Sequence, residues 1–179
     1  KFSGKAYQTS GGLHGVGASV VNALSDSMVV QVARDRKVFE QRFSRGLPLG
    51  PVAEVGAAPN RRGTTVTFHA DEEIFGKHRF KPARLFKSIR SKAYLFSGVG
   101  SRWKAPIDDD ESPTEATFHF PGGLTDYLTE TRGTASTCAD APFSGTVDFQ
   151  ERFGTPGKVE WAINWTPSRD GFIQSYCNT

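Results

Sequence analysis

The sequence predicts an α+β protein, in which amphipathic helices pack on antiparallel strands. Three observations lead to this class. A glycine-rich stretch runs directly into an apolar, helix-compatible segment at residues 18–24. Two β-prone runs, 28–33 and 38–43, are joined by four polar residues, which is typical of a hairpin. A second amphipathic helix, at residues 82–96, has proline in its first turn and apolar residues at helical spacing.

Composition agrees with a folded chain of mildly basic charge. The 179 residues are 37% hydrophobic and 12% aromatic, enough to bury a core and too many for a disordered protein. No apolar run approaches the roughly 20 residues that span a bilayer. The net charge of +3 is compatible with a nucleic-acid partner and does not require one. Cys138 and Cys177 lie far apart and the four histidines are scattered, which indicates free thiols and no metal site.

The remaining elements are shorter. A loop-rich stretch after residue 46 holds one short strand candidate at 52–55. Residues 61–68 read as a turn that feeds a strand, with Thr64, Val66 and Phe68 on the inward face. Residues 101–105 and 115–120 form the arms of another hairpin. Pro121-Gly122-Gly123 then interrupts the chain, and it is followed by a short helix near Leu124 and strand candidates at 147–149, 159–165 and 172–177.

The glycine-rich stretch is the strongest candidate for a binding site. Residues 11–17 read GGLHGVG. Glycines let the backbone take positive φ and lie bare against a ligand, and the unsatisfied amides of the following helix suit a phosphate chain. The stretch lacks the G-K-[ST] ending of a Walker loop and the upstream strand of a dinucleotide fold. Because a tight turn before a buried helix uses the same glycines, their spacing alone does not decide between the two.

A longer string around these glycines carries a family resemblance. Residues 7–17 read YQTSGGLHGVG and residues 19–25 read SVVNALS. This string resembles the ATP lid and third nucleotide-binding motif of the B subunits of bacterial type II topoisomerases, which share an ATPase superfamily with mismatch-repair ATPases, histidine kinases and a heat-shock chaperone. Within that family, residues 161–167 (WAINWTP) look more like topoisomerase IV than gyrase. Because Lys1 falls inside the lid, we expect the chain to be a fragment of a longer polypeptide.

The resemblance implies a fold and two domains. The fold would be a two-layer α/β sandwich of the gyrase, chaperone, histidine-kinase and mismatch-repair ATPase type, incomplete here, followed by the first part of a β-α-β transducer domain. Residues 1–121 would be the C-terminal part of the ATPase domain, with the helix 82–96 backing its sheet. Residues 122–179 would be the N-terminal part of the transducer, with the glycines at 122 and 123 at the junction.

The resemblance also implies a set of ATP-binding residues. The Tyr7 ring would lie beside the nucleotide, because a phenol suits a site that is apolar on one side and exposed to water on the other. Thr64 would join a water-bridged network to the adenine, and Arg34 would lie at the outer edge of the pocket. From the residues alone, packing of Thr64 in a core and solvation of Arg34 in a turn are equally good interpretations. The phosphate loop itself would supply Gly12, Leu13, His14, Gly15, Val16, Gly17 and Ala18.

The catalytic parts are expected outside this sequence. In the resemblance, the general base, the magnesium asparagine and the adenine-binding aspartate precede Lys1, and the transducer lysine follows Thr179. We therefore expect no catalytic residue and no metal ligand within the chain, and no ATP hydrolysis by the chain alone. The parent enzyme would be an ATP-dependent type II DNA topoisomerase that uses ATP and Mg²⁺.

The implied partners and the alternatives complete the expectation. The parent would act in the cytoplasm, without a membrane, on DNA and with the A subunit that cleaves and religates it. Its ATPase regions would dimerise on ATP binding, for relaxation, decatenation and chromosome segregation. A kinase or chaperone of the same superfamily would share the loop but lack the transducer-like sequence after Gly122. A non-enzymatic basic binding module would explain the lysines and arginines but not the loop.

Overall fold

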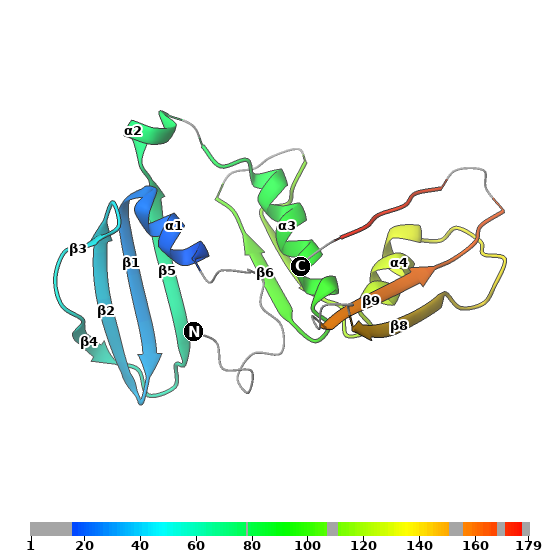
Figure 1. The fold of residues 1–179 in the computed structure, drawn as a ribbon, viewed down its shortest axis with the longest axis horizontal. Helices are drawn as coiled ribbons and strands as arrows, with labels where there is room; N and C mark the ends of the chain where they lie inside the picture. Colours follow the sequence, from blue (N-terminus) through cyan, green and yellow to red (C-terminus); the bar gives the residue numbers. More distant parts are fainter. Residues whose placement is uncertain (1–15, 78, 107–110, 151–155, 168–170, 177–179) are drawn as a thin grey trace. The chain divides into compact units, whose positions relative to one another are not determined.

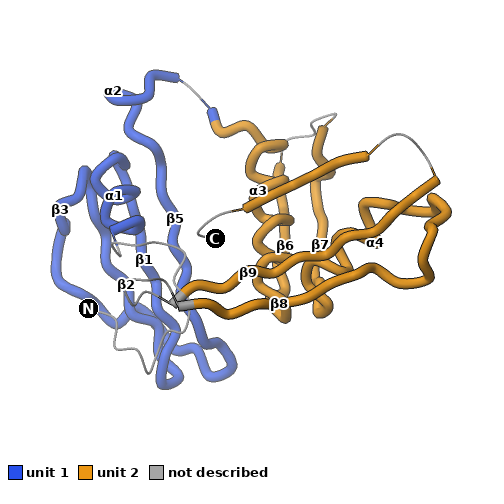
Figure 2. Tube along the Cα trace, turned by 45° about the vertical axis from the view of Figure 1, so that its right-hand side comes forward, with its two compact units in different colours: residues 1–79, 178 blue, residues 80–177, 179 orange. Residues whose placement is uncertain are grey.

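The computed structural model describes residues 16–77, 79–106, 111–150, 156–167 and 171–176. These residues form helices and antiparallel sheets, so the predicted mixed class is confirmed (Figure 1). The chain divides into two compact units, one up to Arg79 and the other from Phe80 (Figure 2). Among the described residues, no helix is long and apolar enough to cross a membrane.

The first unit is one antiparallel sheet with two short helices. The described strands lie in the order β3-β2-β1-β5, and β4 also pairs with β2. The helix α1 contacts β1 and β2 and lies over the end of the sheet where β1 begins (Figure 1). The elements are α1 (Gly17–Ala23), β1 (Ser25–Arg34), β2 (Lys37–Ser44), β3 (Leu47–Pro48), β4 (Ala53–Ala57), β5 (Gly63–Ala70) and α2 (Glu72–Phe75).

The predicted hairpin at the centre of this sheet is confirmed. β1 and β2 pair from Met28 opposite Phe43 to Arg34 opposite Lys37. Asp35 and Arg36 form the loop, with φ of 53° and 64°. Two central residues with positive φ give the turn whose twist matches that of the flanking strands. The local sequence therefore determines both the loop and the register.

The sheet is amphipathic because its side chains alternate between two faces. The register places apolar residues on one face: Met28, Val30, Val32, Phe39, Phe43, Val66 and Phe68. The opposite face carries polar residues, among them Gln31, Glu40 and Arg42. Gln31 Nε2 and Arg42 Nε both donate to the Glu40 carboxylate, each at 2.8 Å, and these bonds hold the pKa of Glu40 below its ordinary value. A sheet face with these polar side chains is compatible with exposure to solvent.

The inward packing predicted for β5 is wrong in the described chain. Thr64, Val66 and Phe68 do share the apolar face, but Val66 is 50% exposed and Phe68 is 42% exposed. The reason is topological, since β5 is an edge strand of the described sheet and the covering helix α1 contacts β1 and β2. Alternation of apolar and polar residues in a sequence shows which side chains share a face of the strand. It does not show whether another element covers that face.

The second unit holds α3 and α4 against two hairpins. Its strands pair antiparallel, β6 with β7 and β8 with β9. Phe86 of α3 packs edge-on against Trp103 and Phe118 of the first hairpin, with ring centroids 5.9 and 5.2 Å away. The elements are α3 (Pro82–Leu95), β6 (Gly100–Lys104), β7 (Glu115–His119), α4 (Leu124–Arg132), β8 (Phe143–Gln150) and β9 (Pro156–Ile163).

The core of this unit forms where α3 meets β6 and β7. Its buried residues are Ala93, Tyr94, Trp103, Ala105, Phe118 and Phe120. Tyr94 also stacks on Tyr127 of α4, with ring centroids 3.8 Å apart. The helix at 82–96 therefore packs within the second unit, on β6 and β7. The boundary predicted between residues 121 and 122 falls inside this unit, and as a domain boundary of the family it stays a prediction.

The sequence predicts a third strand at 172–177, but the described part of that range, residues 172–176, forms no strand. Side chains hold this segment instead. The hydroxyl groups of Tyr176 and Tyr94 are hydrogen-bonded, and Tyr127 Oη donates to Gln174 at 2.7 Å. A strand requires a partner for its backbone groups, and side-chain anchoring does not provide one.

Candidate nucleotide-binding site

The first amides of α1 are without a side-chain cap among the described residues. Val16 is the N-cap residue, and the first turn of the helix holds no acidic residue. A Cβ built on Gly17 would meet nothing within 4 Å among the described residues. Uncapped amides at the positive end of a helix fit an anionic group such as a phosphate. Gly17 lies in the helix and does not have positive φ. A glycine at this position therefore serves to let a ligand approach the backbone closely.

Five of the predicted loop and lid residues lie outside the described residues. These are Tyr7, Gly12, Leu13, His14 and Gly15. Their assignment to ATP stays a prediction. The described part of the predicted phosphate loop is Val16, Gly17 and Ala18, all of them exposed.

Thr64 and Arg34 lie on the same face of the sheet. Thr64 is directly opposite Val32 across β1 and β5, and Arg34 follows Val32 by two residues, so the two side chains are diagonal neighbours on the apolar face. Both are exposed. Arg34 pairs with Asp35 at 3.2 Å. Among the described residues, the Thr64 hydroxyl has no hydrogen-bond partner, so it is available to a ligand or to water.

The C-terminal end of α1 is held by backbone hydrogen bonds from both flanking connections. After β2, Arg45 N donates to the Ser25 carbonyl at 2.7 Å and Gly46 N to the Asn22 carbonyl at 3.1 Å. After β5, Asp71 N donates to the Leu24 carbonyl at 3.0 Å. The C-terminal end of α1 is thereby attached to the sheet that carries Thr64 and Arg34.

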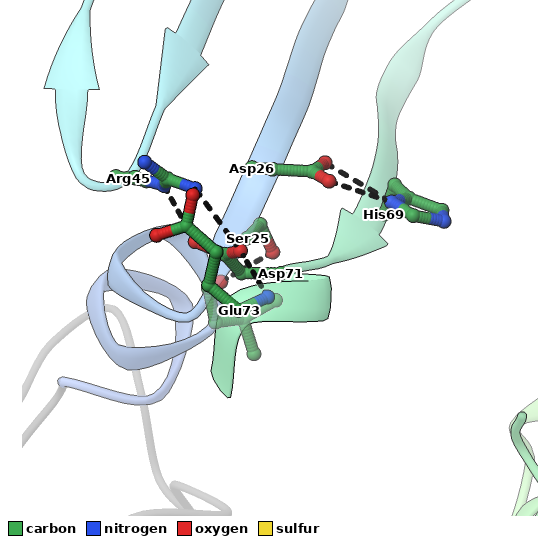
Figure 3. Close-up of polar contacts among 7 residues, drawn as sticks. Ser25, Asp26, Arg45, His69, Asp71 and Glu73 are labelled. Carbon is green, nitrogen blue, oxygen red and sulfur yellow. Dashed lines mark hydrogen bonds and ion pairs between the residues drawn. The ribbon is translucent and has the colours of Figure 1, made fainter. Parts of the chain in front are cut away.

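An ion pair connects these two flanking connections, and the sequence prediction missed it. Arg45 Nε lies 2.6 Å from Asp71 Oδ2, and Arg45 Nη2 lies 3.3 Å from Asp71 Oδ1 (Figure 3). Asp71 also accepts from Glu73 N at 2.9 Å and so caps α2. These bonds, with Arg45 the largest cause, hold the pKa of Asp71 below its ordinary value. An aspartate followed by two glutamates is a typical helix start, and that signal could have found Asp71.

The described acidic residues do not gather near the start of α1. Among the residues that the structure describes, no three His, Cys, Asp or Glu side chains lie together as a metal site, so Mg²⁺ is assigned no ligand here. The nearest acids in sequence are engaged elsewhere, Asp26 with His69 at 3.0 Å and Asp35 with Arg34. A hollow of about 250 Å³ lies in the second unit near the start of α4 and beside Trp161, and it contains none of the predicted site residues.

Comparisons with known proteins identify the family of the chain. No protein-family model matches the chain. The chain is 54% identical over its whole length to the B subunit of DNA topoisomerase 4 from Caulobacter vibrioides and 52% identical to that from Bartonella bacilliformis. It is 38% identical over 99% of its length to that from Salmonella typhimurium. The chain spans about a quarter of these relatives, 26% of the length of the first.

A solved structure gives the same result for the fold. The 43K ATPase domain of Thermus thermophilus gyrase B, solved in complex with an aminocoumarin, matches 77% of this chain and 37% of its own, with a TM-score of 0.65 and 37% identity. The predicted ATPase-type fold is therefore confirmed. From these sequence and structure matches, the chain belongs to the family of B subunits of bacterial type II DNA topoisomerases.

Proposed function

We propose that the chain is an ATP-binding part of a type II DNA topoisomerase that couples ATP binding and hydrolysis to clamp closure and DNA strand passage. The observation that carries the proposal is the 54% identity, along the whole chain, to the B subunit of a DNA topoisomerase 4. The start of α1 supports it, because no side chain of the described residues caps this helix and a phosphate chain would meet its free amides there.

In this proposal each described residue has a defined task. The amides of Gly17 and Ala18 donate to phosphate oxygens, and the absence of a side chain on Gly17 lets the phosphates approach the backbone. The Thr64 hydroxyl joins a water-bridged network to the adenine, since it can donate and accept. The Arg34 guanidinium closes the outer edge of the pocket. The bound ATP supplies the phosphoanhydride whose hydrolysis drives the cycle.

The wider assembly follows from the same proposal. The longer protein would require Mg²⁺, dimerise through its ATPase regions on binding ATP, and act in the cytoplasm on DNA with the A subunit that cleaves and religates it. Relaxation and decatenation would serve chromosome segregation. None of the described residues is given the part of general base or metal ligand.

The test uses the longer protein that carries this sequence, combined with its A subunit. ATP-dependent relaxation of supercoiled DNA, lost in Gly17→Val and retained in Arg42→Gln, is the expected result. ATP hydrolysis without any relaxation would favour a kinase or chaperone of the same superfamily. Binding of DNA with no response to ATP would favour a basic binding module and would reject the proposal.

A further inference from the structure

We propose that Arg45 and Asp71 are positioning residues for the nucleotide: their ion pair holds α1 in place on the sheet, so that Val16–Ala18 and Thr64 meet the same ligand. The inference rests on the proposed function, because it takes the start of α1 to be the phosphate site. Neither residue is placed in contact with the nucleotide. Both would act through the helix.

The first step is the way in which α1 is attached. The helix has seven residues, so it is only about 10 Å long. Its C-terminal end is held by the carbonyls of Asn22 and Leu24, which accept from Gly46 and Asp71. A small rotation about this end would displace the start of the helix relative to the sheet. The position of Gly17 therefore depends on the two segments that hold Asn22 and Leu24.

The second step is that one ion pair joins those two segments. Arg45 and Asp71 are 26 residues apart, and each donates a backbone amide to the region around the end of α1. Their side chains meet through two contacts, and Arg45 Nη2 also lies 2.6 Å from Glu73 (Figure 3). A two-point guanidinium–carboxylate pair fixes direction as well as distance. It thus limits the relative movement of the two segments.

The third step is burial. The Asp71 side chain is 3% exposed and that of Arg45 is 49% exposed, so solvent reaches the arginine but scarcely the carboxylate. A carboxylate in this position needs its partners, because a buried charge without them is costly. Arg45 has φ of +49°, which is uncommon for a residue with a side chain. The backbone turn after β2 delivers this guanidinium to Asp71 at the end of α1.

The chain offers a matched control on the same strand. Arg42 also pairs with a mostly buried acid, Glu40, at 2.8 Å, but on the polar face of the sheet, and Glu40 lies on β2 itself and not in the connection after β5. Glu40 keeps a hydrogen bond from Gln31 when Arg42 is replaced. Arg42→Gln therefore removes a comparable arginine contact without touching the attachment of α1.

The experiment measures the ATPase of the longer protein that carries this sequence, well below the melting temperature of each variant. For Arg45→Gln, which leaves the cap of α2 intact, we expect KM for ATP to rise about fivefold to tenfold with kcat within about twofold of wild type. Arg45→Lys keeps the positive charge but loses the two-point contact of the guanidinium. Its KM for ATP should therefore lie between those of the wild type and Arg45→Gln. Arg42→Gln should leave KM unchanged.

The outcomes separate this inference from the proposed function. Loss of folded protein alone lowers the apparent kcat and leaves KM unchanged, and that pattern in Arg45→Gln would overturn the inference. So would an equal rise of KM in Arg42→Gln. If Gly17→Val retains wild-type affinity for an ATP analogue, the phosphate site itself is misplaced and the proposed function fails. If Gly17→Val abolishes binding while Arg45→Gln has normal KM and kcat, only the positioning role fails.

Discussion

Arg45 and Asp71 lie at the ends of different strands and meet as an ion pair of 2.6 Å beside the last turn of α1. The pair has a defined pH dependence. Because the pKa of Asp71 is lowered in the folded chain, its charged form stabilises the fold above the ordinary aspartate value of 3.8, and this contribution is lost as the pH falls below it. Arg45 stays charged throughout, since its pKa is raised.

We therefore expect the difference in free energy of unfolding between the wild-type chain and Asp71→Asn to be largest near neutral pH and to shrink toward about pH 3. Urea unfolding at a series of pH values measures it. A difference that stays constant over this range would mean that the charge of Asp71 does not stabilise the fold.

Gly17→Val tests the phosphate site without disturbing the protein interior. A Cβ at this position meets none of the described residues within 4 Å, so the fold should remain intact by circular dichroism. Affinity for an ATP analogue should fall by at least about 100-fold, because the branched side chain occupies the space in front of the amides. Calorimetric titration of the longer protein measures the affinity, and unchanged affinity in a folded variant would contradict the assignment.

Thr64→Val separates a binding threonine from a packing one. Loss of one water-bridged hydrogen bond should weaken ATP binding by about twofold to tenfold with little change in stability, because Thr64 is exposed. Thr67→Val, on the opposite face of the same strand, is the control and should bind normally. Equal affinities in the two variants would leave Thr64 without a role in binding.

Gly145 leaves room for the indole of Trp161 across the β8–β9 hairpin. A Cβ built on Gly145 would overlap that ring, so Gly145→Ala should destabilise the second unit by about 1–3 kcal/mol. Gly100→Ala is the control, because its Cβ meets nothing within 4 Å. Thermal unfolding followed by tryptophan fluorescence compares them, and equal melting temperatures would show that the indole moves aside freely.

The 179-residue chain alone should not release phosphate from ATP. The acids nearest to the start of α1 in sequence are Asp26, which lies beyond the far end of the helix, and Asp35, which lies in the β1–β2 turn, so neither is placed to orient a water at the phosphates. A steady-state phosphate assay with excess Mg²⁺ and ATP checks this. Turnover clearly above that of a Gly17→Val control would place a general base within this sequence.

The elements built from near neighbours follow from the sequence alone. The β1–β2 hairpin depends on two alternating runs and a two-residue turn, and α1 and α3 depend on apolar residues at helical spacing. The candidate site was also identified from the sequence, through the glycine-rich loop and the motif that resembles the family. A glycine-rich backbone before a helix is a local property of the chain. For Thr64 the local pattern left binding and core packing equally open, and for Arg34 it left binding and solvation in a turn equally open.

Only the tertiary structure decided which distant residues meet. Arg45 and Asp71 are brought together by the order β2-β1-β5, which no spacing along the chain encodes. The exposure of Val66 and the absence of a strand at 171–176 have the same origin, because burial and strand pairing depend on what lies alongside. Side-chain alternation determines the faces of a strand locally, whereas the partner of each face depends on contacts between residues far apart in the chain.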